Sequence, residues 1–141
     1  LTLLVSLTLL RDEAGRRLED LASGRGIERA WSEASGTSLA AVAIDARARA
    51  ADPVAAALFD RAGRSLGRAI RHLVEVLDPH EVVLGGGLGA ADHSGGRALS
   101  AELAAVPARP GFPPVRPARG GADAGLLGAA ILAGRAAAAA A

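Results

Sequence analysis

The chain has 141 residues, the length of a single domain, and its net charge is +1. All sixteen basic residues are arginines spread along the chain, which argues against a concentrated basic surface for nucleic acid. The absence of cysteine excludes disulfides and thiolate metal sites, and it fits the cytoplasm, the compartment we expect. Half of the residues are hydrophobic, but alanine dominates them and aromatic residues are few, so we expect a thin, close-packed core.

The chain begins with an apolar run, Leu1–Leu10, which is too short for a membrane-spanning helix of about 20 residues. It also lacks the basic region and the cleavage site of a signal peptide, so we expect no membrane association. We predict that the run is a buried strand, or the remnant of one, and that the charged residues 11–17 form a turn. The chain contains no Met, so Leu1 is not an ordinary translated start, and we expect residues 1–141 to be a fragment with residues 1–17 as an atypical lead-in.

Helical patterns dominate the first half of the chain. We predict a short helix from Leu18, a break at Gly24–Gly26 and a second helical turn to Trp31, followed by a helix over residues 39–50. The clearest element is a helix that starts at Asp52-Pro53, a favoured cap and first residue, and ends at Asp78-Pro79. Apolar residues recur along it at a spacing of three to four.

Two glycines, Gly63 and Gly67, lie inside this long helix, where each costs about 1 kcal/mol relative to alanine. They would let another element approach closely. Drift in a glycine-rich sequence is an equal alternative.

The second half alternates strands and helices. We predict a strand at residues 81–84, a glycine turn at 85–87 and a helix at 96–105. An edge strand at 115–118, a final helix at 124–133 and a fraying alanine tail at 134–141 follow. The order of helix, strand, helix, strand and helix indicates an α/β fold with at least part of a parallel sheet.

Two glycine-rich stretches could contact a ligand. The turn Gly85–Gly87 could present backbone N–H groups to a phosphate or a nucleoside, or it could be a plain tight turn. In Gly121–Ala130, Asp123 could cap a helix, and small residues such as Gly125 allow either close packing or approach of a planar ligand. Neither stretch is a Walker A motif. A Rossmann domain is a weak alternative, because the turn comes late in the chain and no acidic ribose partner follows.

Four segments together resemble the ROK family of repressors, open reading frames and kinases. Val82–Gly87 resembles the family's "vvlGGGv" turn, and Ala122–Ala130 resembles its "dAGliGAA" stretch. Leu18–Gly24 is similar to its "GCLEayaSG" segment, and residues 52–79 are similar to the long helix before the glycine turn. These segments follow the family's order from Leu18 to Ala133.

The resemblance implies an incomplete actin-like ATPase (ribonuclease H-like) domain, with the chain as the C-terminal lobe of an ATP-dependent sugar kinase. The lobe would contain the long helix, the strand, the glycine turn and the terminal helix. Glu19 would accept hydrogen bonds from the hydroxyls of a hexose or amino sugar, although it could also be a solvated residue at a helix start. The nucleotide pocket would be lined by Gly85, Gly86 and Gly87, with Asp123 and Gly125 beside it. ATP and Mg²⁺ are the expected cofactors, and a homodimer is an expected assembly.

Departures from the family pattern limit this expectation. The family's zinc motif has the form CxCGxxGCxE, but Arg16-Arg17 stand where Gly-Cys is expected, so we expect no zinc. Its sugar-binding "ExGH" segment has no counterpart before Glu19, and we expect the three histidines to be ordinary surface or helix residues. The phosphate-binding hairpin and the general-base Asp are also missing. We therefore assign no catalytic residue and expect these residues alone to lack kinase activity.

Three origins remain open at this point. The chain could be a lobe of a glucokinase-like enzyme, which requires an upstream glycine-rich hairpin and a catalytic Asp. It could be the effector domain of a sugar-responsive repressor, which requires an upstream helix-turn-helix and is the only case that predicts nucleic acid as a partner. It could also be a degenerate remnant, which requires neither.

Overall fold

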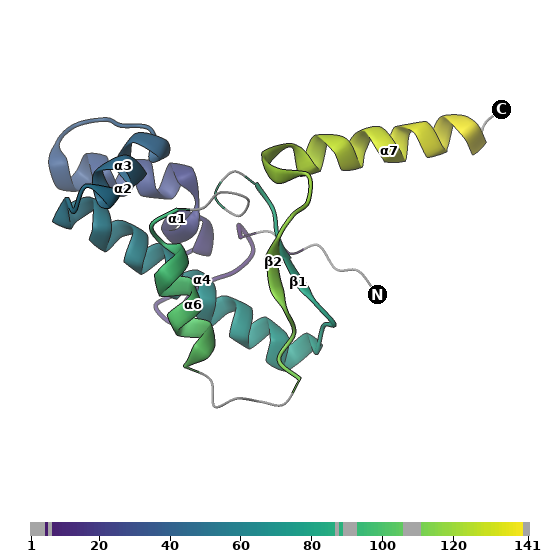
Figure 1. Cartoon of the computed structure of the whole chain (residues 1–141), viewed down its shortest axis with the longest axis horizontal. Helices are drawn as coiled ribbons and strands as arrows, with labels where there is room; N and C mark the ends of the chain where they lie inside the picture. The colour runs from purple at the N-terminus through teal and green to yellow at the C-terminus, as the bar shows by residue number, and fades with distance from the viewer. Residues whose placement is uncertain (1–4, 6, 87, 89–92, 106–110, 140–141) are drawn as a thin grey trace. The chain divides into compact units, whose positions relative to one another are not determined.

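The computed structural model describes residues 5, 7–86, 88, 93–105 and 111–139 (Figure 1). The chain forms two compact units. The first comprises Leu1–Asp78 and His93–Phe112, and the second comprises Pro79–Asp92 and Pro113–Ala141. Each unit is described by itself.

The first unit is helical in its described part. Its helices are α1 (Leu18–Ala22), α2 (Gly24–Ser35), α3 (Ala41–Arg49), α4 (Pro53–Leu77) and α6 (Gly96–Ala104). The long helix α4 contacts all four of the others, and α6 lies alongside it (Figure 1). The core therefore gathers on the faces of α4, as the predicted apolar spacing requires.

Local chemistry sets both ends of α4 where the sequence predicted them. The carboxylate of Asp52 accepts hydrogen bonds from the N–H groups of Val54 and Ala55, at 3.0 and 3.1 Å. The following proline occupies the first turn, where its missing N–H costs nothing. At the other end Asp78 adopts a left-handed conformation with φ of 43°, which stops the helix.

The buried apolar residues come from every helix of this unit. Phe59 and Ile44 are fully buried and Trp31 is 4% exposed, so the few bulky residues occupy the centre. The other buried apolar side chains are Leu18, Leu21, Ala22, Ile27, Ala55, Leu58, Ala62, Ile70, Val74 and Ala98. Alanines fill several of these positions, in line with the thin, close-packed core that the composition predicted.

The glycines inside α4 lie where α6 approaches. A Cβ at Gly63 would collide with the carbonyl oxygen of Gly95 and would lie 2.9 Å from the backbone nitrogen of Leu99. A Cβ at Gly67 would lie 2.7 Å from the Cβ of Glu102. The expectation that these glycines permit close approach is confirmed, and the approaching element is a helix.

Polar contacts hold the start of α6 against its neighbours. The Asp45 carboxylate on α3 accepts the Ser94 N–H at 2.7 Å and the Nε–H of Arg49 at 2.8 Å. Burial raises the pKa of Asp45, but the hydrogen bonds from Arg49 and Ser94 outweigh it, so the net pKa lies below its ordinary value. The ring of His93 lies 5.7 Å from that of Phe59. His93 thus packs against Phe59 from the segment before α6. It is neither the exposed residue nor the helix residue that we expected.

The break between the first two helices differs from the prediction. It falls at Ser23, which is extended with φ of −105° and ψ of 162°, and not at Gly24–Gly26. The Ser23 hydroxyl accepts the N–H of Gly26 at 3.0 Å and caps α2. A capping side chain restarts the helix here, and the glycines form its first turn.

The predicted N-terminal strand is wrong for the residues that the structure describes. Leu7–Leu9 form a turn, and Leu9 is 78% exposed. Residues 1–4 and 6 lie outside the described part of the chain. The carbonyl groups of Leu7 and Leu10 accept N–H groups from the start of α1, at 3.2 and 2.8 Å, so the run folds back on a helix.

The second unit contains a two-stranded parallel sheet, as predicted. Strand β1 (Val82–Leu84) pairs with β2 (Val115–Pro117), with Val82 opposite Val115. A bidentate ion pair between Arg116 and Glu81, with N–O distances of 2.8 and 2.9 Å, joins strand β2 to the residue before β1. A short 3-10 helix, η1 (Gly121–Asp123), then leads into α7 (Ala124–Ala139).

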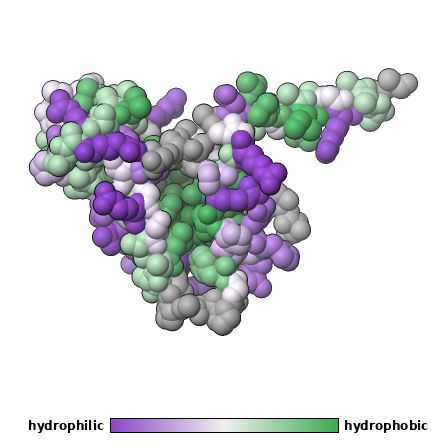
Figure 2. Space-filling view, viewed as in Figure 1, coloured by the Kyte–Doolittle hydropathy of each residue, from purple (hydrophilic) through white to green (hydrophobic). Residues whose placement is uncertain are grey.

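Helix α7 is longer than predicted. Its regular structure continues through the alanines to Ala139, where we expected a fraying tail after residue 133, because alanine is the strongest helix former. Four large apolar side chains lie exposed on it, at Leu126, Leu127, Ile131 and Leu132 (Figure 2). Among the residues that the structure describes, no helix is both long and apolar enough to cross a membrane.

The close approach at Gly63 gives a test of the packing. We expect Gly63→Ala to lower the free energy of unfolding by about 1–3 kcal/mol, because a methyl group collides with the backbone of the segment that begins α6. Gly24→Ala is the matched control, since its Cβ would meet only the Ala41 Cβ at 3.7 Å. Urea unfolding followed by circular dichroism measures both. Equal stabilities for the two variants would contradict the packing described here.

The lowered pKa of Asp45 predicts a pH dependence of stability. The ionised carboxylate stabilises the fold fully above its unfolded pKa of 3.8, and this contribution is lost as the pH falls through the lower folded pKa. Asp45→Asn keeps an acceptor for Ser94 and removes the charge. Thermal unfolding at pH of about 7 and about 3 should therefore show a smaller acid-induced drop for the variant than for the native chain. An identical drop would contradict the assignment.

Candidate functional site

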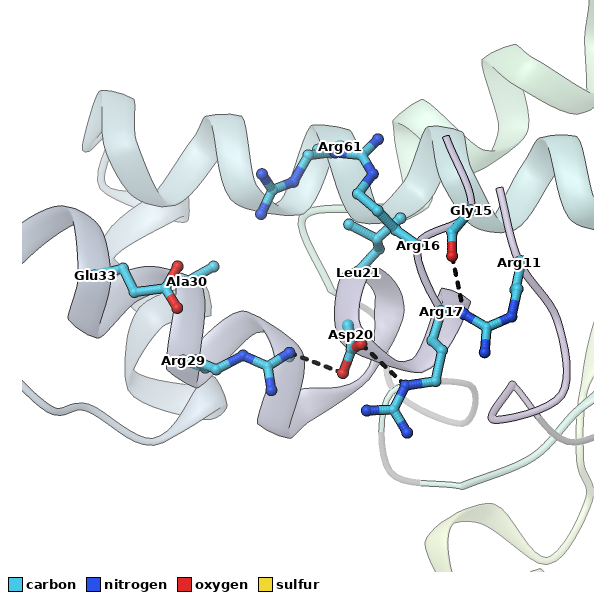
Figure 3. Close-up of a pocket in the computed structure, with 11 residues that line it drawn as sticks. Arg11, Gly15, Arg16, Arg17, Asp20, Leu21, Arg29, Ala30, Glu33 and Arg61 are labelled. Carbon is cyan, nitrogen blue, oxygen red and sulfur yellow. Dashed lines mark hydrogen bonds and ion pairs between the residues drawn. The ribbon is translucent and has the colours of Figure 1, made fainter. Parts of the chain in front are cut away.

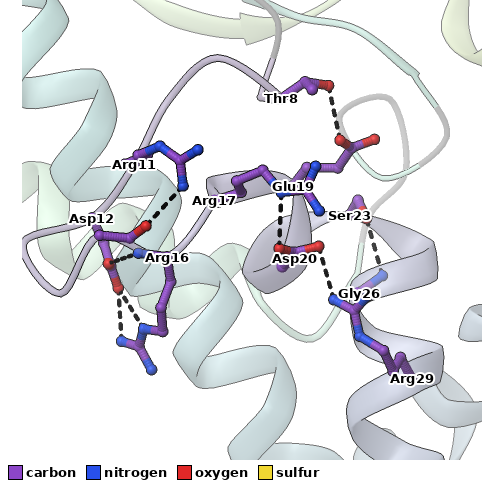
Figure 4. Close-up of polar contacts among 11 residues, drawn as sticks. Thr8, Arg11, Asp12, Arg16, Arg17, Glu19, Asp20, Ser23, Gly26 and Arg29 are labelled. Carbon is purple, nitrogen blue, oxygen red and sulfur yellow. Dashed lines mark hydrogen bonds and ion pairs between the residues drawn. The ribbon is translucent and has the colours of Figure 1, made fainter.

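Glu19 lies in the first turn of α1, and its side chain is held from outside the helix. The Thr8 hydroxyl donates to Glu19 Oε2 at 2.8 Å, and the Glu19 N–H donates to the Leu7 carbonyl at 3.2 Å (Figure 4). Glu19 is half-buried. Among the described residues, Glu19 Oε1 makes no hydrogen bond.

The loop before α1 is closed by one carboxylate. Asp12 Oδ1 accepts the N–H groups of Ala14 and Arg16 at 3.0 and 2.8 Å, and Asp12 Oδ2 accepts the Nε–H of Arg16 at 2.8 Å (Figure 4). The hydrogen bond from the Arg16 side chain is the main cause that lowers the pKa of Asp12. Arg11 and Arg17 pair across the loop as an isolated antiparallel bridge. The predicted turn over residues 11–17 is therefore confirmed, and its shape is specified by Asp12.

Asp20, the next residue after Glu19, joins α1 to its neighbours. It accepts hydrogen bonds from Arg29 on α2 at 2.8 Å and from Arg17 at 3.2 Å (Figure 4). The Arg29 hydrogen bond is the main cause that lowers the pKa of Asp20. The two adjacent acids thus differ in role, since Asp20 is engaged by two arginines and Glu19 by a single hydroxyl.

An open cavity of about 450 Å³ lies beside Asp20 (Figure 3). Its charged lining consists of Asp20, Glu33 and five arginines, namely Arg11, Arg16, Arg17, Arg29 and Arg61. Three of these guanidinium groups already form ion pairs, Arg16 with Asp12 and both Arg17 and Arg29 with Asp20. Glu19 does not line this cavity, so the cavity is not the predicted sugar contact.

In the second unit, the glycine turn follows strand β1. Gly86 has φ of 81°, a left-handed conformation that favours glycine. A Cβ built on Gly85 or Gly86 would meet no described atom within 4 Å. Gly87, the third predicted glycine, lies outside the described residues.

The second predicted stretch follows strand β2. The Ala118 N–H donates to the Leu84 carbonyl at 2.8 Å, and Gly121 then turns the chain with φ of 57°. Asp123 ends η1 and Gly125 lies in the first turn of α7, and both are exposed. The two glycine-containing segments therefore follow the carboxyl ends of two paired parallel strands, the edge at which sheets of this class bind ligands.

The predicted site residues fall into two groups. Glu19 belongs to the first unit, whereas Gly85, Gly86, Asp123 and Gly125 belong to the second. Each group has the surroundings described above, and the roles assigned to its residues remain predictions.

Zinc does not fit the residues before α1. With Glu19 as the register, the three cysteines of CxCGxxGCxE fall on Leu10, Asp12 and Arg17. A leucine has no donor atom, and a guanidinium is a cation without an acceptor. Both oxygens of the remaining carboxylate, Asp12, are already bonded within the loop. Among the described residues, no three histidine or acidic side chains gather as a metal site.

Comparison with known proteins decides the family. The sequence model of the ROK family matches residues 14–136. This chain belongs to the ROK family. A curated relative, the N-acetyl-D-glucosamine kinase of Pasteurella multocida (strain Pm70), is 35% identical over 119 residues, covering 82% of this chain and 38% of the relative.

Solved structures agree with this assignment. The crystal structure of the ROK hexokinase from Thermus thermophilus matches 89% of this chain, with a TM-score of 0.75 and 35% identity, and the match covers 46% of that chain. The ROK family glucokinase from Streptomyces griseus, in complex with glucose and AMPPNP, matches 82% with a TM-score of 0.64 and 27% identity, covering 44% of that chain. The fold is that of the actin-like ROK kinases, and this chain spans less than half of each of these relatives.

Two residues near Glu19 were not predicted from the sequence. Thr8 lies in the run interpreted as a strand, and Asp12 lies in the loop interpreted only as a turn. The spacing of Asp12 from Arg16, four residues later, is a signal that could have revealed the loop closure. Nothing in the sequence indicates the contact of Thr8 with Glu19, because the loop must form before the two residues meet.

The glycine turn generates a prediction about its conformation. We expect Gly86→Ala to destabilise the turn by about 1–2 kcal/mol, because a side chain at positive φ is strained. Gly85→Ala introduces the same methyl group at the neighbouring position, where φ is not positive, and should leave the turn unchanged. Amide hydrogen exchange of the β1 residues measures both. Equal protection in the two variants would contradict the turn geometry.

Proposed function

We propose that this chain is the C-terminal lobe of a ROK-type, ATP-dependent sugar kinase, and that it supplies a sugar contact and part of a nucleotide pocket. Glu19 would accept hydrogen bonds from hydroxyl groups of a hexose or amino sugar. The single observation that carries this proposal is the Glu19 carboxylate, half-buried at the start of α1. One of its oxygens is held by Thr8, and the other has no hydrogen bond among the described residues.

The chemistry of this carboxylate suits a sugar. Sugar hydroxyls are hydrogen-bond donors, and an ionised carboxylate accepts several bonds on its two oxygens. The hydroxyl of Thr8 holds Oε2 in place, so less rotamer freedom remains to be lost when a ligand binds. The curated kinase relative and the glucokinase solved with glucose support a hexose or amino sugar as the ligand class.

The second unit would contribute to the nucleotide pocket. Gly85 and Gly86 have no described atom where a side chain would lie, so a nucleotide could approach the backbone closely. Asp123 and Gly125 follow the neighbouring strand and would lie beside this pocket. The glucokinase solved with AMPPNP supports ATP as the nucleotide. Mg²⁺ would neutralise charge on the phosphates when bound.

Phosphoryl transfer requires more than these residues provide. It depends on positioning and on stabilisation of charge around the phosphoryl group, and it needs a group that accepts the proton of the sugar hydroxyl. No residue of this chain matches the family's general-base Asp, and the chain spans 38% of the curated kinase. We therefore infer that residues 1–141 bind ligand weakly and transfer no phosphoryl group on their own.

Binding measured on the purified chain tests this function. We expect glucose or N-acetylglucosamine to shift the amide resonances of the Glu19 region in an NMR titration. Glu19→Gln should raise the dissociation constant about tenfold, since bonds to a charged group contribute about 1.5–3 kcal/mol each. Glu13→Gln is the matched control, because Glu13 is exposed and, among the described residues, has no hydrogen bond or ion pair.

Two results would contradict the proposal. The absence of any shift with either sugar in the native chain would remove the sugar contact. Sugar-dependent ATP turnover by these residues in a coupled assay would overturn the inference that the chain is inactive alone.

A further inference from the structure

The charged loop before α1 is a closed, self-contained unit. The Asp12 carboxylate is 13% exposed and engages two backbone N–H groups and the guanidinium of Arg16. The Asp12 N–H donates to the Arg16 carbonyl at 2.9 Å, and Arg11 donates to the Gly15 carbonyl at 2.9 Å. These contacts close the loop with protein groups alone. We call the contacts between Asp12, Ala14 and Arg16 the Asp12 clasp.

The two ends of this loop lead directly to Glu19. Before the loop, the chain lies along the start of α1, where Leu10 accepts the Leu18 N–H and Leu7 accepts the Glu19 N–H. After the loop, Arg17 leads into α1 itself. Thr8, which contacts the Glu19 carboxylate, lies on the first of these arms (Figure 4). The loop therefore joins the arm that carries Thr8 to the start of α1.

The clasp occupies the place where the family motif has metal-binding cysteines. With Glu19 as the register, Asp12 stands at the position of the second cysteine, and the residues at the three cysteine positions do not fit zinc. Both Thr8 and Asp12 precede residues 14–136, the part of the chain that matches the family. The Thr8 hydroxyl and the Leu7 carbonyl that contact Glu19 therefore come from the segment before the matched residues.

We propose that Asp12 is a positioning residue that takes the place of a metal. Its clasp holds the lead-in segment against α1, so that Thr8 fixes the Glu19 carboxylate for its ligand. The part of this inference that concerns sugar binding rests on the proposed function. The effect of the clasp on the positions of Thr8 and Glu19 does not depend on that function. The loop is closed without a metal, and its closure acts on the site through Thr8.

Amide hydrogen exchange tests the clasp independently of any sugar. Asp12→Ala should speed exchange of the Glu19 N–H, which donates to Leu7, while amides in the middle of α4 remain protected and show that the chain is folded. Glu13→Ala, at the neighbouring exposed residue, should leave Glu19 unchanged. Dialysis of the native chain against EDTA should also leave it unchanged. Unaltered exchange at Glu19 in Asp12→Ala, or faster exchange after EDTA, would overturn the proposal.

Sugar titration of the same variants tests the link to the ligand. We expect Thr8→Val and Asp12→Ala each to raise the dissociation constant about fivefold. Thr8→Val removes the hydrogen bond to Glu19 Oε2, and Asp12→Ala would release the arm that carries Thr8. The double variant should be no weaker than either single variant, because both act through one contact. Asp12→Asn keeps an acceptor for the loop N–H groups, so it should restore part of the affinity.

The outcomes separate the two proposals. Faster exchange at Glu19 in Asp12→Ala, in a native chain that binds neither sugar, would support the clasp and reject the proposed sugar contact. Additive losses in the double variant would overturn the role of Asp12 as a residue that acts through Thr8. If Asp12→Ala does not fold, the same measurements of exchange at Glu19 and of the dissociation constant are made on Thr8→Val and Asp12→Asn.

Discussion

The packing of helix α4 is the constraint on which the first unit depends. Every other described helix of that unit contacts it, and its glycines let the segment that begins α6 approach to backbone distance. With few bulky apolar residues in the chain, close approach between small residues replaces the contact area that larger side chains would supply. Helix α1 also packs against α4, so the residue proposed to bind sugar stands on a helix that this packing anchors.

Polar contacts fix the positions of the helix starts and of the lead-in loop, which the apolar packing does not determine. Asp45 fixes the start of α6, Asp20 joins α1 to α2, and Asp12 shapes the lead-in loop. Each uses a carboxylate with arginine or backbone N–H groups as partners, in a chain whose basic residues are all arginine. A guanidinium offers several donors in a fixed plane, so one acid can hold two segments together. Such contacts order the residues around Glu19.

Local signals were sufficient to predict the long helix α4 and the two paired strands, but not the N-terminal segment or the surroundings of Glu19. The ends of α4 follow from Asp52, Pro53 and Asp78, whose effects act within one turn, and the strands follow from short apolar runs beside glycine. The start of α2 was missed because Ser23, a stronger signal than the glycines after it, was not treated as a cap. The contact between Thr8 and Glu19 joins residues eleven positions apart, and it exists only once the loop has closed. No pattern of neighbouring residues predicts such a contact.

A crystal structure of the chain soaked with glucose or N-acetylglucosamine would test most directly whether the Glu19 carboxylate of this ROK-family chain contacts a sugar. We expect sugar hydroxyl oxygens at about 2.5–3.0 Å from the carboxylate oxygens of Glu19, with the Thr8 contact retained. A sugar bound elsewhere, with Glu19 facing solvent, would contradict it.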